Sequence, residues 1–450
     1  MPVTWDVAGT DAAPIGVTEV KISLSVDGGN TFPHVLAERT ANDGTESVTL
    51  PNVGAKAARI KIEAVGNVFF DLNDANFALR ATPTVTSTGG ELVTVQYSDP
   101  ILPEVHVTAT DPDGGPGQLT ATATGLPAGL LLGTKSPEEP DTNGKPAVWG
   151  VVGNNRATPG DYPVTVTVTD QHGLVGTVSF TIRVLPESAE VAYTGDTLVS
   201  AAGSGRNAEV LLQANLREIS PYTGAEPWPG DVSTATVTFT AGGRTLCTDV
   251  PAPLGTDEFA SVASCTASLP TGSHEVTATL GGNYAGSAKG RVEVSRSGTS
   301  VVLGGGSLTP TRSAGAYRVD PNSKVDFTVL VAQTRLGGTG TSIVSFRSEG
   351  RKYEIRGVGL DSFGVRSSGG TDRLDLRTRA GLYDVTDPRR PVAVATGLTL
   401  RITGTDRGLL GGRDGIAVTL AEGDRLLLSS AWTGLASQEV NLTSGTLLVL

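Results

Sequence analysis

The sequence predicts an all-β protein, an elongated string of about four immunoglobulin-like or other β-sandwich domains. Its 450 residues exceed what one hydrophobic core can serve, and they suit three or four domains of about 100–150 residues each. Segments in which apolar and polar residues alternate recur along the chain, and this is the period of a half-buried strand. Turn-forming clusters rich in glycine, of which the chain has 58, separate these segments.

The alternating segments are rich in valine and threonine, which favour strands. In residues 163–169, three valines occupy one face and three threonines the other. The same period appears at residues 21–26, 59–65, 235–239, 276–280 and 325–331. The one sustained run of helix-forming residues, 206–218, stands in an otherwise strand-like context.

Domain boundaries are expected where a closing strand is followed by short polar or proline-containing sequence, because few contacts cross such segments. These breaks follow residues 79, 184 and 294. We therefore predict four domains, at residues 1–80, 81–186, 187–296 and 297–450.

The formal charge of −12 is unevenly distributed along the chain. Residues 296–450 hold 19 Lys+Arg and 14 Asp+Glu, a net charge of +5. Residues 1–295 hold the other 15 Lys+Arg and 32 Asp+Glu, a net charge of −17. The acidic part disfavours nucleic acid and anionic membrane surfaces as partners. The arginine-rich C-terminal surplus could contact an anionic wall polymer, or it could simply form a solvated surface among the interspersed acids.

Cysteine usage indicates the redox environment. Cys247 and Cys265 are the two cysteines and lie in one predicted domain. A closely spaced pair predicts a single disulfide formed in an oxidising compartment. The alternative is a pair of reduced, unreactive thiols.

Targeting signals are not evident in the chain. No apolar run reaches the ~18–20 residues that a membrane-spanning helix needs, and no signal peptide opens the sequence. Residues 1–5 enter strand-like sequence directly. We therefore expect the C-terminal part of a longer secreted or cell-surface precursor, whose signal peptide lies upstream.

Residues 3–79 resemble the β-sandwich found downstream of the catalytic domain in bacterial secreted zinc metalloproteases. The stretches 3–10, 22–32, 42–52 and 58–77 carry the resemblance. It implies an N-terminally truncated accessory domain that follows an upstream catalytic domain. Residues 25–32 (SVDGGNTF) also look like an Asp-box, which the chemistry of Asp27, Asn30 and two glycines explains as a hairpin turn.

Residues 84–185 are similar to the Ig-like and cadherin-like modules of bacterial surface proteins, at 107–114 (VTATDPDG), 125–129 and 159–170. Related cadherin-like repeats bind calcium through Asp-x-Asp and a downstream Asp. The resemblance thus implies Asp111, Asp113 and Asp170 as calcium ligands. Calcium takes six to eight oxygens, more than these three carboxylates supply, and the alternative is that they cap turns at strand ends.

Residues 187–295 resemble bacterial Ig-like repeats that stack in extracellular stalks, at 193–195, 208–216 and 272–284. This resemblance implies that residues 206–218 form a strand and that the family's cysteine pair maps onto Cys247 and Cys265. Residues 299–450, at 304–308, 325–331, 343–347 and 445–450, resemble a C-terminal β-domain of actinobacterial secreted proteins. This resemblance implies no particular activity.

Catalytic motifs were not found. His34, His106, His172 and His274 are scattered over three domains, and neither His-Glu-x-x-His nor Gly-x-Ser-x-Gly occurs. The chain has enough carboxylates for the catalytic pair of a glycosidase. Small sandwiches in a string, however, rarely build the substrate cleft that such a pair requires. The four tryptophans fall one to a domain, which favours core anchors over a sugar-stacking platform.

We therefore predict a non-catalytic, extracellular accessory or stalk region that spaces or tethers an upstream catalytic domain, expected to be a metalloprotease. The alternative is an adhesion module that binds an extracellular protein or glycan, and a third hypothesis is a hydrolase within the last domain. Calcium is the one cofactor considered. Nucleic acid is not an expected partner.

Overall fold

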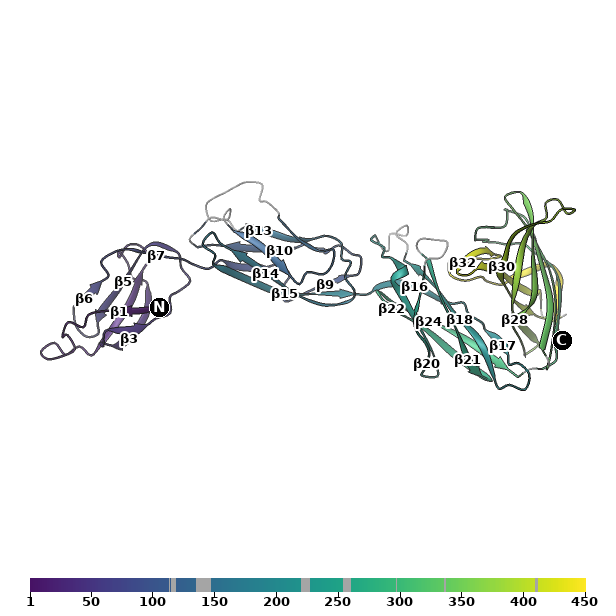
Figure 1. Ribbon diagram of the computed structural model, residues 1–450, viewed down its shortest axis with the longest axis horizontal. Helices are drawn as coiled ribbons and strands as arrows, with labels where there is room; N and C mark the ends of the chain where they lie inside the picture. Colours follow the sequence, from purple (N-terminus) through teal and green to yellow (C-terminus); the bar gives the residue numbers. More distant parts are fainter. Residues whose placement is uncertain are drawn as a thin grey trace. The chain divides into compact units, whose positions relative to one another are not determined.

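The computed structural model describes residues 1–450 except 113, 115–118, 135–146, 220–226, 254–259, 297, 336 and 409–411. The described residues form β-strands, a single 3₁₀ turn (η3, Val232–Thr234) and loops (Figure 1). The all-β prediction is confirmed. Nothing helical in this part of the chain is long and apolar enough to cross a membrane. The chain divides into two compact units, Met1–Leu185 and Pro186–Leu450.

Residues 1–79 form a five-stranded sheet and a two-stranded ribbon around a small apolar core. Ile22 and Leu24 alternate along the central strand and are fully buried. The sheet order is β3-β2-β5-β6, with β7 also paired to β5, and β1 pairs with β4. The strands are β1 (Pro2–Thr4), β2 (Glu19–Ser25), β3 (His34–Ala41), β4 (Thr45–Ser47), β5 (Ala55–Ala64), β6 (Phe70–Leu72) and β7 (Phe77–Leu79).

The expected hairpin turn follows β2. Asp27 Oδ1 accepts the backbone N–H of Thr31 at 2.9 Å, and Asp27 Oδ2 accepts the Thr31 hydroxyl at 2.6 Å. Gly28 and Gly29 have φ values of 78° and 95°, which glycine adopts without steric cost. The hydrogen bonds from Thr31 and Ser25 hold the pKa of Asp27 well below its usual range. This stretch is therefore fully explained as a turn.

Residues 84–185 form two four-stranded sheets, ordered β12-β13-β10-β8 and β11-β14-β15-β9. Val164, Val166 and Val168 of β14 are buried, whereas the threonines between them are partly exposed, so the predicted alternation places valines in the core. The strands are β8 (Thr84–Ser87), β9 (Leu92–Gln96), β10 (Val105–Thr110), β11 (Thr120–Thr124), β12 (Leu131–Thr134), β13 (Ala147–Val152), β14 (Gly160–Thr169) and β15 (Val175–Leu185).

Residues 187–295 form a second sandwich, with sheets ordered β21-β18-β16-β23 and β17-β24-β22-β19-β20. Residues 206–218, the one helix candidate, form strand β18, as the resemblance implied. The strands are β16 (Glu187–Tyr193), β17 (Leu198–Ser200), β18 (Asn207–Glu218), β19 (Ala235–Ala241), β20 (Arg244–Pro251), β21 (Ala260–Pro270), β22 (Gly272–Gly282), β23 (Tyr284–Ala285) and β24 (Ser287–Ser295).

Residues 300–450 form one sheet that closes on itself, which we call the closed sheet. The order is β30-β29-β28-β27-β26-β25-β33-β31-β32, and β30 also pairs with β31, which completes the ring. Its interior is filled by a large apolar cluster that includes Phe327, Phe346 and Ile355. The strands are β25 (Ser300–Leu308), β26 (Val325–Thr334), β27 (Gly337–Ser348), β28 (Arg351–Ser368), β29 (Thr371–Asp384), β30 (Val392–Asp406), β31 (Gly415–Glu422), β32 (Arg425–Ser429) and β33 (Val440–Val449).

The closure of this sheet goes beyond the sequence analysis, which predicted only a β-domain here. Alternation along β29 places Leu374 and Leu376 inside and leaves Arg373, Asp375 and Arg377 on the outer face. Arg373, Asp375 and Arg377 therefore face outward, where another domain can contact them.

Candidate functional site

The predicted calcium ligands lie at strand ends. Asp111 follows β10, Asp170 follows β14, and Asp113 lies outside the described residues. Asp170 is 6% exposed, and its Oδ1 accepts the backbone N–H groups of His172 and Leu174 at 2.8 and 2.7 Å. The described residues contain no group of three or more His, Cys, Asp or Glu side chains that could hold a metal ion. Calcium binding by these three aspartates stays a prediction.

Replacing Asp170 with alanine is expected to lower the free energy of unfolding by about 1–2 kcal/mol, because two backbone donors of the β14–β15 turn lose their acceptor. Chemical denaturation of the full chain measures the change. Glu91→Ala removes an exposed carboxylate from the same unit and is the matched control. A loss that appears only when calcium is present, and is absent in chelator, would contradict the turn explanation and support a metal role.

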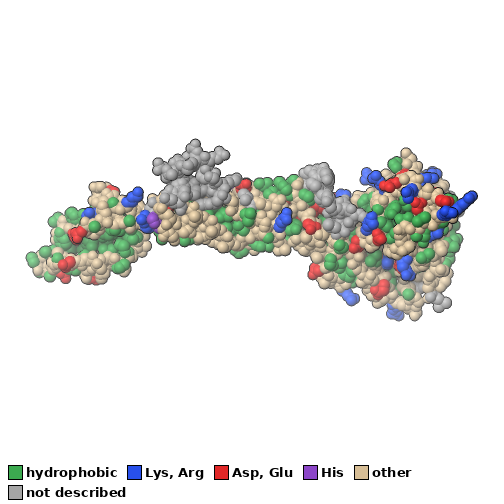
Figure 2. Space-filling model, turned by 45° about the horizontal axis from the view of Figure 1, so that its top comes forward, with side chains coloured by type: hydrophobic (Ala, Val, Ile, Leu, Met, Phe, Trp, Pro, Cys, Tyr) green, Lys and Arg blue, Asp and Glu red, His purple; other side chains and the backbone are tan. Residues whose placement is uncertain are grey.

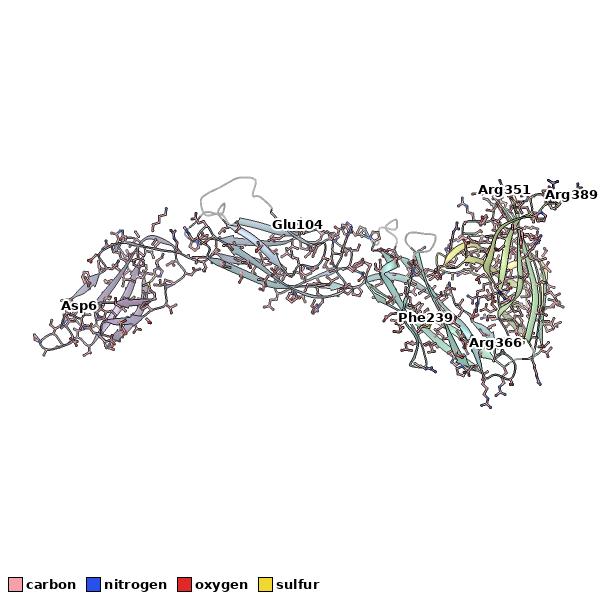
Figure 3. The ribbon with its side chains drawn as sticks, viewed as in Figure 1. Asp6, Glu104, Phe239, Arg351, Arg366 and Arg389 are labelled. Atoms are coloured by element: carbon pink, nitrogen blue, oxygen red, sulfur yellow. A yellow bond between two sulfur atoms is a disulfide. The ribbon has the colours of Figure 1, made fainter. Side chains whose placement is uncertain are left out.

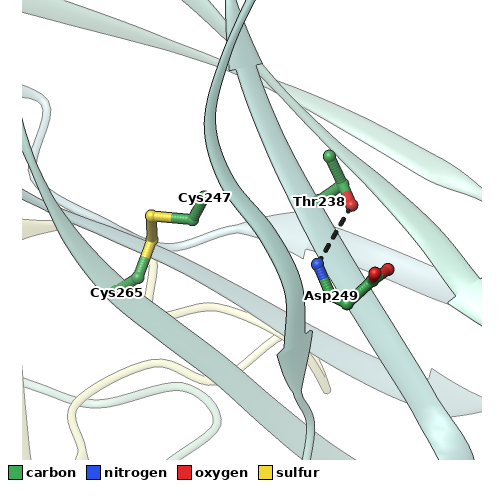
Figure 4. Close-up of a disulfide and its surroundings, with 4 residues drawn as sticks. All are labelled: Thr238, Cys247, Asp249 and Cys265. Carbon is green, nitrogen blue, oxygen red and sulfur yellow. Dashed lines mark hydrogen bonds between the residues drawn. A yellow bond between two sulfur atoms is a disulfide. The ribbon is translucent and has the colours of Figure 1, made fainter.

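Cys247 and Cys265 form a disulfide in the structure (Figure 4). Cys247 belongs to β20, the edge of the five-stranded sheet, and Cys265 belongs to β21, the edge of the four-stranded sheet. Beside it, the backbone N–H of Asp249 donates to the Thr238 hydroxyl at 3.3 Å. The disulfide therefore links the two sheets of this sandwich at one side.

The tryptophans occupy different environments. Trp5 packs against the core of residues 1–79, and its Nε1 donates to Asn42 Oδ1 at 2.9 Å. Trp228 is 39% exposed, and the side chain of Trp149 lies outside the described part of the chain. Trp432 lines a groove on the closed sheet. The core-anchor interpretation therefore holds for Trp5 and does not describe Trp432.

Four charged side chains, Asp196, Asp375, Arg377 and Arg401, form a buried ion-pair network between residues 187–295 and the closed sheet. Arg401 donates to both oxygens of Asp375, at 2.7 and 3.0 Å, and also to the backbone carbonyls of Thr194 and Gly195. Arg377 donates to both oxygens of Asp196, at 3.1 Å each. The network thus fixes the loop after β16 on the outer face of β29 and β30.

The two aspartates of the network are also bound by backbone groups. Asp375 Oδ2 accepts the backbone N–H and the hydroxyl of Thr197, at 2.8 and 2.7 Å. Asp196 Oδ2 accepts the backbone N–H of Leu211 at 2.8 Å. Asp196 and Asp375 are only 1% and 2% exposed. Each buried carboxylate is therefore paired with an arginine and with at least one backbone donor, which buried charges require.

Electrostatics keep the Asp375–Arg401 pair ionised. Burial acts to raise the pKa of Asp375, but the charge and hydrogen bonds of Arg401, together with the donors of Thr197, outweigh it and hold that pKa below its usual value. Burial acts to lower the pKa of Arg401, and Asp375 more than compensates, so that this pKa is raised. Both groups therefore stay charged at neutral pH.

Strand β17 approaches β28 closely at Gly364. A Cβ added at Gly364 would lie 2.4 Å from the backbone carbon of Leu198 and 2.6 Å from the backbone nitrogen of Val199. Real side chains do not reach such distances to backbone atoms, so only glycine fits. This contact and the buried ion-pair network attach the two domains of residues 186–450 to each other.

A groove of about 810 Å³ lies between these two domains, and we call it the interdomain groove. One wall is the outer face of β18, with Leu211, Gln213 and Asn215. The other wall is the outer face of β29, β30 and β31, and residues 432–439 border it. The sequence analysis expected small sandwiches to build a substrate cleft only rarely, and a groove forms here because two outer faces meet.

Arginine dominates the charged lining of the interdomain groove. The lining cations are Arg291, Arg366, Arg373, Arg377 and Arg401, and the lining acids are Glu293, Asp424 and Glu439. Burial without a compensating cation raises the pKa of Asp424. Guanidinium groups stay protonated at neutral pH and do not exchange protons with a substrate, so this lining suits binding better than acid–base catalysis.

None of these groove residues was singled out from the sequence, although one signal was present. Residues 373–377 (RLDLR) alternate charged and apolar side chains, which places these charges on a single face of a strand. An outward row of charges is usually a solvated surface, so the pattern alone does not indicate a partner. The presence of a partner becomes visible only from the opposing wall, which is formed by β18, far earlier in the chain.

Comparisons with known proteins give one family match, over part of the chain, and several distant structural similarities. The family model described as Putative Ig domain matches residues 76–185. An I-band fragment of titin is 12% identical over 63% of this chain and 89% of that chain, with a TM-score of 0.25. A mouse clustered protocadherin is 16% identical over 65% of this chain and 92% of that chain, with a TM-score of 0.23.

Fibronectin(III)-like modules of CbhA from Clostridium thermocellum are 13% identical over 47% of this chain and 95% of that chain, with a TM-score of 0.19. TM-scores this low carry no argument about function. None of the curated proteins matches the sequence. The comparisons therefore show that residues 76–185 are similar to an Ig domain.

Proposed function

We propose that this chain is a non-catalytic stalk region of a larger extracellular protein, in which successive β-domains space a catalytic domain that precedes Met1. The observation that carries the proposal is the fixed attachment within residues 186–450. A spacer must hold one domain at a set position relative to the next, and a contact made by buried, hydrogen-bonded charges does this better than a linker alone. The match of residues 76–185 to an Ig domain supports the same class of protein.

The extracellular location is proposed from the disulfide. Cys247 and Cys265 are bonded across two sheet edges. Such bonds persist in oxidising compartments and are rare in reducing ones. Secretion of the parent protein follows from the same reasoning.

A zinc metalloprotease is proposed as the upstream catalytic domain, on the resemblance of residues 3–79 to the accessory sandwich of those enzymes. The sequence encoded immediately before Met1 tests this, and a His-Glu-x-x-His motif there is the expected result. Deleting residues 1–450 from the parent should slow cleavage of surface-bound substrate and leave cleavage of soluble substrate unchanged, because tethering acts through effective concentration. Equal slowing of both would contradict a spacing role.

The Gly364→Ala variant tests the fixed attachment directly. We expect a loss of about 1–3 kcal/mol in the unfolding free energy of the last two domains, because the new methyl group overlaps the backbone of β17. Equilibrium denaturation measures it, with Gly298→Ala as the control, since a Cβ there meets nothing within 4 Å. Equal stability of the two variants would show that β17 and β28 are not held together in solution.

A second candidate function, adhesion through a bound ligand, is favoured by the interdomain groove. A stalk that only spaces domains has no use for a concave surface of about 810 Å³ lined by arginines. Grooves of ~300–1,000 Å³ with a few polar groups and an aromatic side chain are typical of small-ligand sites.

A further inference from the structure

One end of the interdomain groove carries an excess of positive charge. Arg291, Arg366 and Arg373 line this end, and Glu293 is the acid among them. Arg291 and Arg366 both pair with the same Glu293 carboxylate oxygen. The side chain of Arg373 has no hydrogen bond or ion pair with any other described residue. We call these three arginines the arginine cluster.

The strand register places two of these positive charges side by side. Arg366 of β28 and Arg373 of β29 are directly opposite each other in the antiparallel pair. Like charges in that position repel, and neighbouring acids usually offset the repulsion. Arg291 and Arg366 share the Glu293 carboxylate, and the Arg373 side chain has no acidic partner among the described residues, so the cluster has cationic groups available for a further anion. Guanidinium forks bind carboxylate, sulfate and phosphate groups through paired hydrogen bonds.

The surface distribution of charge agrees with this placement. In the view of Figure 2, Lys and Arg side chains gather over the closed sheet and are sparse over residues 1–185. The arginine cluster differs from this general surplus because it lines a groove. Arg366 lies where the closed sheet meets the strands of residues 187–295, whereas Arg389 lies at the opposite end of the closed sheet (Figure 3).

The rest of the groove indicates what carries the anion. The groove is lined by Arg373 at one end and by Thr399 at the other. Thr399 pairs with Arg379 of β29, which is six residues from Arg373. The length of the groove along the strands is therefore roughly 20 Å. Trp432 offers an aromatic face, and Asp424 and Glu439 offer carboxylates that accept hydrogen bonds. Hydroxyl groups are the donors that such carboxylates bind, and sugars carry many of them.

The same acids argue against nucleic acid. A polyphosphate carries a charge at every repeat and would place phosphates against Asp424 and Glu439. A chain of sugars with an occasional acid group fits this groove better. The acid group can lie at the cationic end, and neutral sugar rings can lie along the polar and aromatic part.

We propose that the interdomain groove binds an acidic polysaccharide, with an acid group of one sugar held by the arginine cluster and the neighbouring sugar rings lying toward Trp432. This ligand site adds a recognition function to the stalk, and the proposed spacing role does not depend on it.

The test is calorimetric titration of the full chain with a galacturonate oligomer, which carries carboxylates, a sulfated dextran oligomer, a neutral galactose oligomer and a short DNA duplex. The double variant Arg366→Gln/Arg373→Gln removes two charges from the cluster. The double variant Arg389→Gln/Arg390→Gln removes two exposed charges outside the groove and is the matched control. Circular dichroism confirms that both variants fold.

We expect the galacturonate or the sulfated oligomer to bind. The cluster variant should bind it at least about tenfold more weakly, because it loses charge-assisted hydrogen bonds to the acid group. The control variant should keep its affinity. Preference between the two oligomers identifies the acid group. Absence of binding by both, equal binding of the neutral oligomer, equal losses in the two variants, or DNA binding as strong as that of the oligomers would each overturn the proposal.

Discussion

The Asp375→Ala variant is expected to lose about 3–5 kcal/mol in the unfolding free energy of the last two domains, the largest single effect that the structure predicts. Asp375 pairs with Arg401 at 2.7 and 3.0 Å and accepts two further hydrogen bonds from Thr197. Removing the carboxylate leaves the Arg401 guanidinium largely buried without its directly bonded counter-charge, since its side chain is only 19% exposed. An unpaired buried charge is far more costly than a lost surface contact.

The control for this prediction is Asp161→Ala. Asp161 makes the same two-pronged pair with Arg183, at 2.6 and 2.7 Å, but both side chains are about half exposed. Solvent screens such a pair, so no measurable loss is expected. Denaturant titration followed by two independent probes measures both variants. Similar losses in the two would show that burial does not set the strength of the Asp375–Arg401 pair.

The pH dependence follows from the lowered pKa of Asp375. A carboxyl group whose pKa is lower in the folded protein than in the unfolded chain stabilises the fold above its unfolded pKa of about 4, and this contribution is lost as the pH falls further. The stability difference between the parent chain and Asp375→Ala should therefore be constant near neutral pH and shrink below about pH 4. A difference that stays constant down to pH 2 would contradict the ionised pair.

Removing the disulfide is expected to have the next largest effect. Cys247 and Cys265 are 18 residues apart, and on the chain-entropy model closing this loop stabilises the fold by about 3 kcal/mol. The Cys247→Ala/Cys265→Ala variant should lose this amount in denaturant titrations. Adding reductant should destabilise the parent chain and leave the variant unchanged, since it has no bond to reduce. A parent chain insensitive to reductant and as stable as the variant would show that the bond contributes nothing to stability.

Local pattern explains why the fold class was predictable. Alternation of valine and threonine along β14 places every second side chain on one face, and this period depends on the backbone alone. The turn at Asp27 was predictable for the same reason, since its hydrogen bonds connect residues no more than four positions apart. Residues 206–218 were harder, because their helix-forming composition competes with tertiary context, and pairing with β16 and β21 decides for a strand.

The candidate site depends on contacts that no local pattern encodes. Arg377 meets Asp196 across 181 positions of sequence, and Arg401 meets the carbonyl of Thr194 across 207. Arg377 and Arg401 are by themselves ordinary polar positions on the outside of a strand, and Asp196 is an ordinary loop residue. These side chains become buried only because the loop after β16 packs on the outer face of β29 and β30.

Local sequence pattern is enough to predict an all-β chain of several domains, the positions of its alternating strands, and a cysteine pair whose spacing suits a disulfide. Tertiary structure alone decided that the last sheet closes into a ring, that its outer face docks on β17 and β18, and that arginines from both domains line a groove. The physical reason is range: strand period and turn chemistry act over a few residues, whereas closure, docking and burial of charge depend on which distant faces come together.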